Sequence, residues 1–378
     1  MTMRLPPAAV VLLALLGACS RPGSGDGALG IGAPMTGDMG PEGQGLERSV
    51  RMAVEDEAAE TGLPAVPVVA FDDKADPFEA VSAARRAVDD PRVFAVIGHM
   101  TSGCAIEASK IYAQAPLAMI TPSATATALT AQQDRSDWGG ERVVFRMPPS
   151  DNVQGEFAAD YAVKRLSLRR FVLVHDRTPY GLGLAESFKE GIERRGAAAL
   201  SMEPVSRGDK DFSATVSAVA AARPDAVFFG GLYLEAGLFL KQLRAAGWRG
   251  TFMSGDGAKN PDLFDTAGPA VDGAYFSVGG TPVESLPSAA DFVERYQKKY
   301  AGAMPRTFDH YAYAAARVAL EAYRKAGNDR KKVLEAVRST RRRTMVGDII
   351  FDAKGDTLKG LVTMTKANYA LRKFEVAY

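Results

Sequence analysis

Two β-like runs in the first half of the chain end in small hydroxyl side chains, where strands more often end in Asn, Asp, Gly or Pro. The first is IGHMTS, in which Thr101 and Ser102 lead into an expected helix. Free backbone amides at the start of a helix, with the Ser102 hydroxyl beside them, are suited to holding a carboxylate. A simple helix N-cap is the plainer interpretation of Ser102 alone, because serine is common at that position.

The second run is LAMIT, which leads into Ser123, Ala124 and Thr125. The Thr125 hydroxyl can donate or accept a hydrogen bond, and the carbonyl group of Ser123 can accept one from an ammonium group. Taken alone, these residues also fit an ordinary polar surface loop. We expect the loop and the Ser102 stretch to form one ligand site.

Three residues in the second half of the chain extend this predicted site. Asp256 lies between two glycines in SGDGAKN and could pair with an ammonium group, although the stretch alone looks like an ordinary turn. Tyr180 and Tyr233 could stack against a ligand or pack at a domain edge. Together these residues supply donors for an anion, acceptors for an ammonium group and aromatic walls.

The sequence lacks the motifs of common enzymes. It has no GxSxG, HExxH, CxxC or GxxxxGK[ST] motif, and GLGLAE lacks the last glycine of a dinucleotide fingerprint. The histidines, His99, His175 and His310, are scattered and lack the spacing of a metal site. For His99 and His175, which end strands, we expect capping or packing. We therefore predict a binding protein with no catalytic residue, metal or cofactor.

The N-terminal stretch MTMRLPPAAVVLLALLGACS predicts an export signal. One positive charge precedes an apolar run that is too short to span a bilayer. The sequence LGAC that follows resembles a bacterial lipobox. We expect removal of residues 1–18, lipidation of Cys19 and a flexible tether over 19–27. The protein would then be exported and held on the periplasmic side of a membrane through lipid alone.

Length and charge limit the other possibilities. The chain has 378 residues and a formal net charge of +1, so the part after the leader is long enough for two domains. A nearly neutral chain without basic runs argues against nucleic acid as a partner. If Cys19 carries lipid, Cys104 has no cysteine with which to form an intramolecular disulfide. We expect Cys104 to be a small buried hydrophobic residue.

β-like runs alternate with amphipathic helical runs twice along the chain, first over 28–121 and again over 143–255. Such alternation predicts parallel sheets with helices on both faces and right-handed crossovers. We therefore predict an α/β fold with two doubly wound parallel-sheet domains. Ligands of such sheets lie beyond the carboxyl ends of the strands, where all the predicted site stretches fall. A cleft between the two domains would bring them together.

Six stretches, in matching order, resemble the leucine/isoleucine/valine-binding family, the type I periplasmic binding proteins of ABC transporters. They are VIGHMTSGCAIEASKIY, MITPSATATALT, HDRTPYGLGLAESFKEGI, KDFSATVSAV, FFGGLYLEAGLFLKQLRAAG and FDAKGDTLKG. The resemblance covers nearly the whole mature chain and implies a hinged clamshell whose chain crosses between the domains three times. On that basis we expect one domain at 28–146 plus 274–345 and the other at 147–273 plus 346–378.

The resemblance also assigns roles within the site. It implies that Ser102 binds the α-carboxylate of an amino acid, helped by the stretch at Ser123 and Thr125. It implies that the same stretch, together with Asp256, receives the α-ammonium group. The positions that match residues lining the family's pocket are Tyr180, Tyr233 and Phe308.

Glu42 departs from the family, whose members usually carry an aromatic residue before a glycine where GDMGPEG places this carboxylate. A carboxylate in a closing cleft is desolvated at high cost unless it is paired or exposed. We expect Glu42 to turn toward solvent, because the neighbouring glycines can redirect it; contact with a polar ligand is the alternative. In either case we expect a polar or larger amino acid to bind better than leucine, isoleucine or valine.

The resemblance implies an extracytoplasmic binding lipoprotein that delivers a small amino acid, or a related ligand, to an ABC permease and its ATPase. We expect a monomer. The alternative is a sensing or regulatory lipoprotein of the same fold that feeds no transporter. Neighbouring genes would distinguish the two, since permease and ATPase genes support transport, whereas a kinase or cell-wall synthase gene supports regulation.

Overall fold

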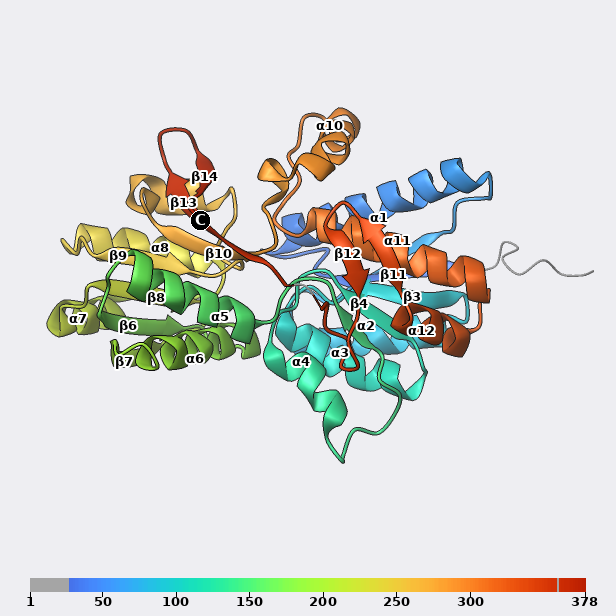
Figure 1. Ribbon diagram of the computed structural model, residues 1–378, viewed down its shortest axis with the longest axis horizontal. Helices are drawn as coiled ribbons and strands as arrows, with labels where there is room; N and C mark the ends of the chain where they lie inside the picture. Colours follow the sequence, from blue (N-terminus) through green and yellow to red (C-terminus); the bar gives the residue numbers. More distant parts are fainter. Residues whose placement is uncertain (1–26, 359) are drawn as a thin grey trace, which may run out of the picture.

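The computed structural model describes residues 27–358 and 360–378, which form two α/β lobes side by side (Figure 1). Each lobe is built on its own sheet, so the predicted pair of α/β domains is confirmed. The expected leader and the lipidated Cys19 lie outside the described residues. Among the helices that the structure describes, each is too short or too polar to span a membrane.

The sheet of the first lobe has five parallel strands in the order β2-β1-β3-β4-β5. Every residue of β1 and β3 is buried, as expected for a parallel sheet that is covered on both faces. The strands, in chain order, are β1 (Ala28–Ala33), β2 (Val68–Asp72), β3 (Val93–Gly98), β4 (Ala118–Thr121) and β5 (Val144–Arg146).

Helices from both ends of the sequence cover the first sheet. The long helix α1 packs against α11, and α2 packs against α3. The side chain of Asp76 accepts hydrogen bonds from the first-turn amides of α2, which begins at Pro77. The helices are α1 (Gly40–Thr61), α2 (Pro77–Asp89), α3 (Ser102–Gln114), α4 (Thr127–Ala131), α10 (Ala290–Lys299), α11 (Asp309–Ala326) and α12 (Arg330–Arg338), with short turns η1 (Gln132–Asp134), η4 (Val283–Ser285) and η5 (Pro287–Ala289).

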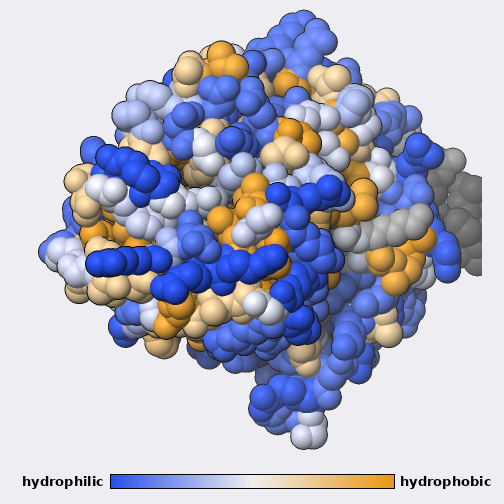
Figure 2. All heavy atoms as spheres, turned by 60° about the vertical axis from the view of Figure 1, so that its left-hand side comes forward, coloured by the Kyte–Doolittle hydropathy of each residue, from blue (hydrophilic) through white to orange (hydrophobic). Residues whose placement is uncertain are grey.

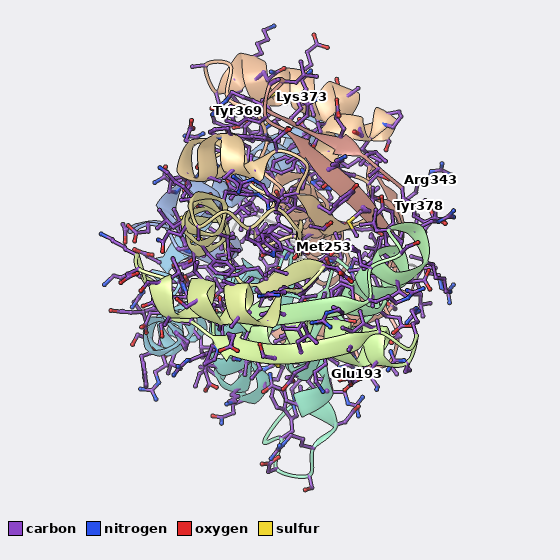
Figure 3. The ribbon with its side chains drawn as sticks, turned by 90° about the vertical axis from the view of Figure 1, so that its left-hand side faces the viewer. Glu193, Met253, Arg343, Tyr369, Lys373 and Tyr378 are labelled. Atoms are coloured by element: carbon purple, nitrogen blue, oxygen red, sulfur yellow. The ribbon has the colours of Figure 1, made fainter. Side chains whose placement is uncertain are left out.

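The sheet of the second lobe has seven strands and is mixed. The predicted parallel series ends with β9, β10 extends it by one parallel strand, and the edge adds two antiparallel strands, β13 and β14, from the end of the chain. Figure 3 shows Met253 within this sheet and Tyr369 and Lys373 at the turn between β13 and β14. In sheet order the strands are β14 (Lys373–Val376), β13 (Val362–Asn368), β10 (Tyr275–Gly279), β9 (Thr251–Ser254), β8 (Ala226–Gly230), β6 (Arg170–His175) and β7 (Ala198–Pro204).

Two helices of the second lobe approach each other closely because glycines lie at their contact. A Cβ on Gly155 of α5 would lie 2.6 Å from the Cβ of Ser187, and one on Gly191 of α6 would lie 2.6 Å from the Cβ of Ala159. This contact fixes the start of α5 beside the start of α6. The helices of this lobe are α5 (Asp151–Asp160), α6 (Pro179–Glu193), α7 (Ser213–Ala222), α8 (Tyr233–Ala245) and α9 (Leu263–Ala267), with the π turn η2 (Tyr161–Arg165) and η3 (Gly268–Val271).

The expected domain boundaries need two corrections. β10 lies at residues 275–279, which were assigned to the first domain, yet it pairs with β9 and β13 of the second sheet. β12 (Gly347–Ile350) was assigned to the second domain, but it forms a hairpin with β11 (Arg341–Thr344), whose Arg342 contacts Glu321 of α11 in the first lobe. Strand pairing therefore places β10 in the second domain and β12 in the first. The chain passes between the lobes after β5, after β10 and before β13 (Figure 1).

Cys104 and His99 are both buried in the first lobe. Cys104 is a free thiol with no exposed surface, as predicted. His99 lies between the Asp73 carboxylate, 2.7 Å from its Nδ1, and the Tyr112 hydroxyl, 2.9 Å from its Nε2. The histidine therefore packs beneath the end of β3 in a satisfied polar environment, as expected.

Surface polarity follows the usual pattern. On the face drawn in Figure 2, hydrophilic residues predominate and hydrophobic ones stand in small groups. Phe78, at the start of α2, is 85% exposed. Isolated exposed apolar side chains of this kind are common on protein surfaces.

Arg146 ties two of the segments that pass between the lobes. Its guanidinium contacts Asp356 at 2.6 Å and donates to the carbonyl oxygens of Thr125 at 2.9 Å and Ala126 at 2.7 Å. A third donor reaches the Thr130 hydroxyl at 2.8 Å. The Arg146 side chain is only 1% exposed, so these four oxygens replace its water shell. The network joins the end of β5 both to the crossing segment before β13 and to the loop after β4.

We expect Arg146→Met to lower the free energy of unfolding by at least about 3 kcal/mol. The change leaves two backbone carbonyl groups and the Asp356 carboxylate without this donor, and each buried unsatisfied acceptor costs about 1–3 kcal/mol. Urea denaturation measures the effect. Arg51→Met is the matched control, since it removes an exposed arginine paired with Glu47. Equal denaturation midpoints for the two variants would show that the network contributes nothing.

Candidate ligand-binding site

A cavity of about 460 Å³ lies between the two lobes, within the size range of small-molecule sites. The ends of strands in both sheets, and the helices that follow them, form its walls. Of the predicted ligand residues, Ala124 and Thr125 are buried but do not line the cavity. Those that line it are Glu42, Thr101, Ser102, Ser123, Tyr180, Tyr233, Asp256 and Phe308.

Ser102 is the first residue of α3, and the N-cap position belongs to Thr101. The Ser102 hydroxyl accepts a hydrogen bond from the amide of Ala126 at 3.1 Å, which holds the loop after β4 against the start of the helix. The plainer N-cap interpretation of Ser102 is therefore wrong. Thr101, Ser102 and Gly103 line the cavity at the positive end of α3, a position that favours an anion.

The loop after β4 is fixed by its own hydroxyl groups. The Ser123 hydroxyl donates to the carbonyl oxygen of Met100 at 2.8 Å, and the amide of Ala124 donates to the Thr121 hydroxyl at 2.9 Å. Thr125 Oγ1 is buried and has no hydrogen-bond partner among the described residues. The Ser123 hydroxyl is thus used within the protein, so the carbonyl group of Ser123 is the better candidate for contacting a ligand.

Asp256 is 2% exposed and held from two sides. One carboxylate oxygen accepts from the Tyr180 hydroxyl at 3.0 Å, and the other accepts from the side-chain amide of Gln154 at 2.7 Å. The Tyr180 hydroxyl also accepts from the Gly257 amide at 2.8 Å. Burial raises the pKa of Asp256 to about 6, while the hydrogen bonds from Gln154 and Tyr180 oppose this change. The carboxyl group is thereby fixed in the cavity wall.

A second carboxyl group, Asp151, lies near Asp256. It begins α5, has no exposed surface, and neither of its oxygens has a hydrogen-bond partner among the described residues. Burial, together with the neighbouring Asp256, raises the pKa of Asp151 well above its ordinary value. Asp151 and Gln154 were missed in the sequence because PPSDNVQG indicates only the start of a helix.

Glu42 does not turn toward solvent, so that expectation is wrong. Its side chain is 5% exposed, and its Oε1 accepts from Arg306 at 2.6 Å and from Asn260 at 2.8 Å. Its Oε2 has no partner among the described residues. Burial raises the pKa of Glu42, and the charge of Arg306 acts in the opposite direction. Arg306 precedes α11, far along the chain, and no sequence pattern pointed to this pair.

Polar contacts join the lobes around the cavity. Glu42 and Arg306 belong to the first lobe, and their partners Asn260 and Asp262 belong to the second, with Arg306 lying 3.0 Å from Asp262. On another side, Arg207 of the second lobe donates to the carbonyl oxygen of Ala75 at 2.9 Å. The structure is therefore a closed form of the clamshell.

Aromatic and apolar side chains complete the walls. Tyr180 and Tyr233 are buried, and Phe308 is half-buried at the start of α11. Burial, and secondarily the Glu42 carboxyl nearby, raises the pKa of Tyr233 above its ordinary value. Apolar surface also comes from Met39, Leu46, Met100, Leu232 and Leu234.

Comparison with known proteins places this architecture in a family. A family model described as "Periplasmic binding protein" matches residues 28–370. "Leu/Ile/Val-binding protein homolog 2" of Brucella abortus (strain 2308) is 36% identical over 332 residues, covering 87% of this chain and 86% of the relative. "Amino acid binding protein" of Pseudomonas aeruginosa is 33% identical over 336 residues, covering 88% of this chain and 87% of the relative.

Solved structures agree with the relatives. A leucine binding protein, LivK, from Thermotoga maritima has a TM-score of 0.83 and 30% identity, covering 93% of this chain and 98% of that one. LivJ from Streptococcus pneumoniae, in complex with isoleucine, has a TM-score of 0.83 and 26% identity, covering 93% and 99%.

The fold and the cavity between the lobes are those of a type I periplasmic binding protein. The chain belongs to the periplasmic binding protein family and is related to the Leu/Ile/Val-binding proteins. It is therefore a binding protein and not an enzyme, as predicted. Membership in this family implies a location outside the cytoplasm.

We expect the ligand-free protein to lose stability as the pH rises from about 6.5 to about 8. Burial raises the pKa of Asp256 to about 6 and that of Asp309 to about 7, above the unfolded values, so ionisation opposes folding. His310 acts in the opposite direction below this range, because burial lowers its pKa from 6.5 to about 3 and only the unfolded state takes up a proton there. Thermal midpoints across this range measure the effect, and Asp256→Asn should reduce it. A midpoint that rises with pH would contradict the prediction.

Proposed function

We propose that the protein is the substrate-binding lipoprotein of an ABC importer and that its ligand is an amino acid or a close analogue. One observation carries the proposal: the start of α3, which favours an anion, and the buried carboxyl group of Asp256 line the same closed cavity. A ligand with an α-carboxylate and an α-ammonium group satisfies both.

In this arrangement the α-carboxylate binds the first-turn amides of α3 and the Ser102 hydroxyl. The α-ammonium group donates to Asp256 and to the carbonyl group of Ser123. Thr101 and the Ala124–Thr125 pair support these contacts. Binding stabilises the closed form relative to the open one, since the ligand contacts both lobes only when they are together. No covalent bond is made or broken.

The relatives support an amino acid as the ligand. They include Leu/Ile/Val-binding protein homologues and an amino acid binding protein, and one solved structure holds isoleucine. These names favour an aliphatic side chain in the relatives. The expectation of a polar or larger amino acid for this chain stays a prediction, and Glu42 is the residue on which it depends.

Delivery to a permease and its ATPase is the role we propose, because the structural neighbours include a branched-chain amino acid transporter substrate binding protein and a putative branched-chain amino acid ABC transporter. The lipobox at Cys19 adds an anchor that keeps the binding protein at the membrane surface. The protein would act as a monomer, because one chain supplies both walls of the cavity.

At neutral pH, Asp256→Asn should weaken the best amino-acid ligand by roughly 2–5 kcal/mol, or about thirtyfold to several thousandfold. The reason is that removing one partner of a buried charge pair leaves the other charge unpaired. Calorimetry with the amino acid that gives the largest thermal shift measures the change. Asp265→Asn, an exposed acid of α9 paired with Arg372, is the control and should bind normally. Unchanged affinity in Asp256→Asn would assign Asp256 a turn role only.

Cys19→Ala should abolish acylation and release the protein from membranes. Thioether-linked acyl chains hold the chain at the bilayer only if Cys19 becomes the first residue of the mature protein. Intact-mass analysis and membrane fractionation test this in the parent and the variant. An unmodified mature chain that begins at another residue would overturn the lipid anchor and leave the ligand site unaffected.

A further inference from the structure

Glu42 is one of several buried carboxyl groups that line the cavity, and its bonding is incomplete. Glu42 Oε1 accepts two hydrogen bonds, from Arg306 and Asn260, whereas Oε2 accepts none among the described residues. The side chain is only 5% exposed and lines the cavity. A buried carboxylate oxygen without a donor is unfavourable unless the ligand or a bound water supplies one.

We propose that Glu42 forms a side-chain subsite that selects an amino acid bearing N–H donors on its side chain. This inference rests on the proposed function, because it assumes that the α-amino and α-carboxyl groups occupy the Asp256 and Ser102 positions. The donor is an ammonium, a guanidinium or a carboxamide, and all three offer the same chemistry to Glu42 Oε2.

The charges around Glu42 favour a cation among these donors. Arg306 is shared between Glu42 and Asp262, at 2.6 and 3.0 Å, so one positive charge meets two negative ones. Lys259, which also lines the cavity, pairs with Glu284 at 2.7 Å. Together, these five side chains therefore carry an excess negative charge before a ligand arrives. This charge would repel a negatively charged ligand side chain at short range.

The two polar ends of the cavity have separate partners. Asp256 is held by Gln154 and Tyr180, whereas Glu42 is held by Arg306 and Asn260. A ligand can therefore engage both ends at once. The apolar surface of Met39, Leu46, Leu232 and Phe308 can cover the methylene groups of a long side chain.

The subsite also depends on closure. Glu42 and Arg306 lie in the first lobe, and Asn260 and Asp262 lie in the second, so the Glu42 environment is assembled only when the lobes meet. A donor that binds Oε2 therefore stabilises the closed form. An aliphatic side chain closes the same space while leaving Oε2 desolvated and unpaired, which disfavours it.

Paired ligands test this on the unmodified full chain. Lysine and norleucine share one carbon skeleton and differ in the terminal ammonium group; arginine, glutamine and leucine complete the calorimetric panel. We expect at least one of lysine, arginine and glutamine to bind about tenfold or more tightly than norleucine and leucine. A preference for lysine or arginine identifies a cationic donor, and a preference for glutamine identifies an amide.

Glu42→Gln tests the residue itself. The amide is nearly isosteric and can still accept from Asn260, but it lacks the charge. The advantage of a cationic ligand over norleucine should fall by about tenfold or more. Glu57→Gln is the matched control, because Glu57 is also buried on α1 and paired with an arginine, Arg317, but does not line the cavity. It should keep the parental preference.

The outcomes separate this inference from the proposed function. If leucine or norleucine binds more tightly than all three donor-bearing amino acids, the subsite is overturned while amino-acid binding stands. If the parent protein prefers the donor-bearing amino acids and Glu42→Gln keeps that preference, another residue recognises the ligand side chain. The subsite is then likewise overturned. If no amino acid binds to the parent protein, both proposals fall together.

Discussion

Desolvation of carboxyl groups is the constraint on which the closed structure depends. The cavity wall contains Asp256 and Glu42, and Asp151 lies behind it, all nearly devoid of exposed surface. A buried carboxyl group must receive donors or keep a proton, since its charge is otherwise too costly. Asp256 receives two donors and has a pKa of about 6, and Glu42 shares an arginine. Asp151, which has no hydrogen-bond donor among the described residues, has its pKa raised well above the ordinary value.

The same constraint explains how the hinge and the site are joined. Arg146 is the buried cation of the crossing region, and it uses its donors on the carbonyl groups of Thr125 and Ala126 as well as on Asp356. These hydrogen bonds therefore fix the backbone of the loop that follows β4. Ser102 fixes the same loop from the other side through the amide of Ala126. A ligand that contacts Ser123 thus contacts a loop whose conformation is already fixed before binding.

Sequence patterns predicted the parts of the fold that depend on local periodicity. The two alternating series predicted over 28–121 and 143–255 contain β1 to β9, because local apolar runs indicate such strands. The predicted domain assignments of β10 and β12 were wrong, because strand pairing is decided by residues far apart in the sequence. In the site, strand ends pointed to Ser102, Ser123 and Asp256, but Arg306 stayed hidden since nothing local links it to Glu42.

Glu42 was expected to turn toward solvent, and its buried position shows which part of the cavity can select between ligands. Its flexible glycine-rich surroundings allowed a solvent-facing side chain, yet an arginine from the loop before α11 and an asparagine from the opposite lobe hold it inside. Each oxygen of the Asp256 carboxyl group already accepts one hydrogen bond from the protein, which fixes its direction, so that end can vary little between ligands. Glu42 retains one open oxygen. An open acceptor in a closed cavity distinguishes ligands by the donors they bring, because shape alone cannot satisfy it.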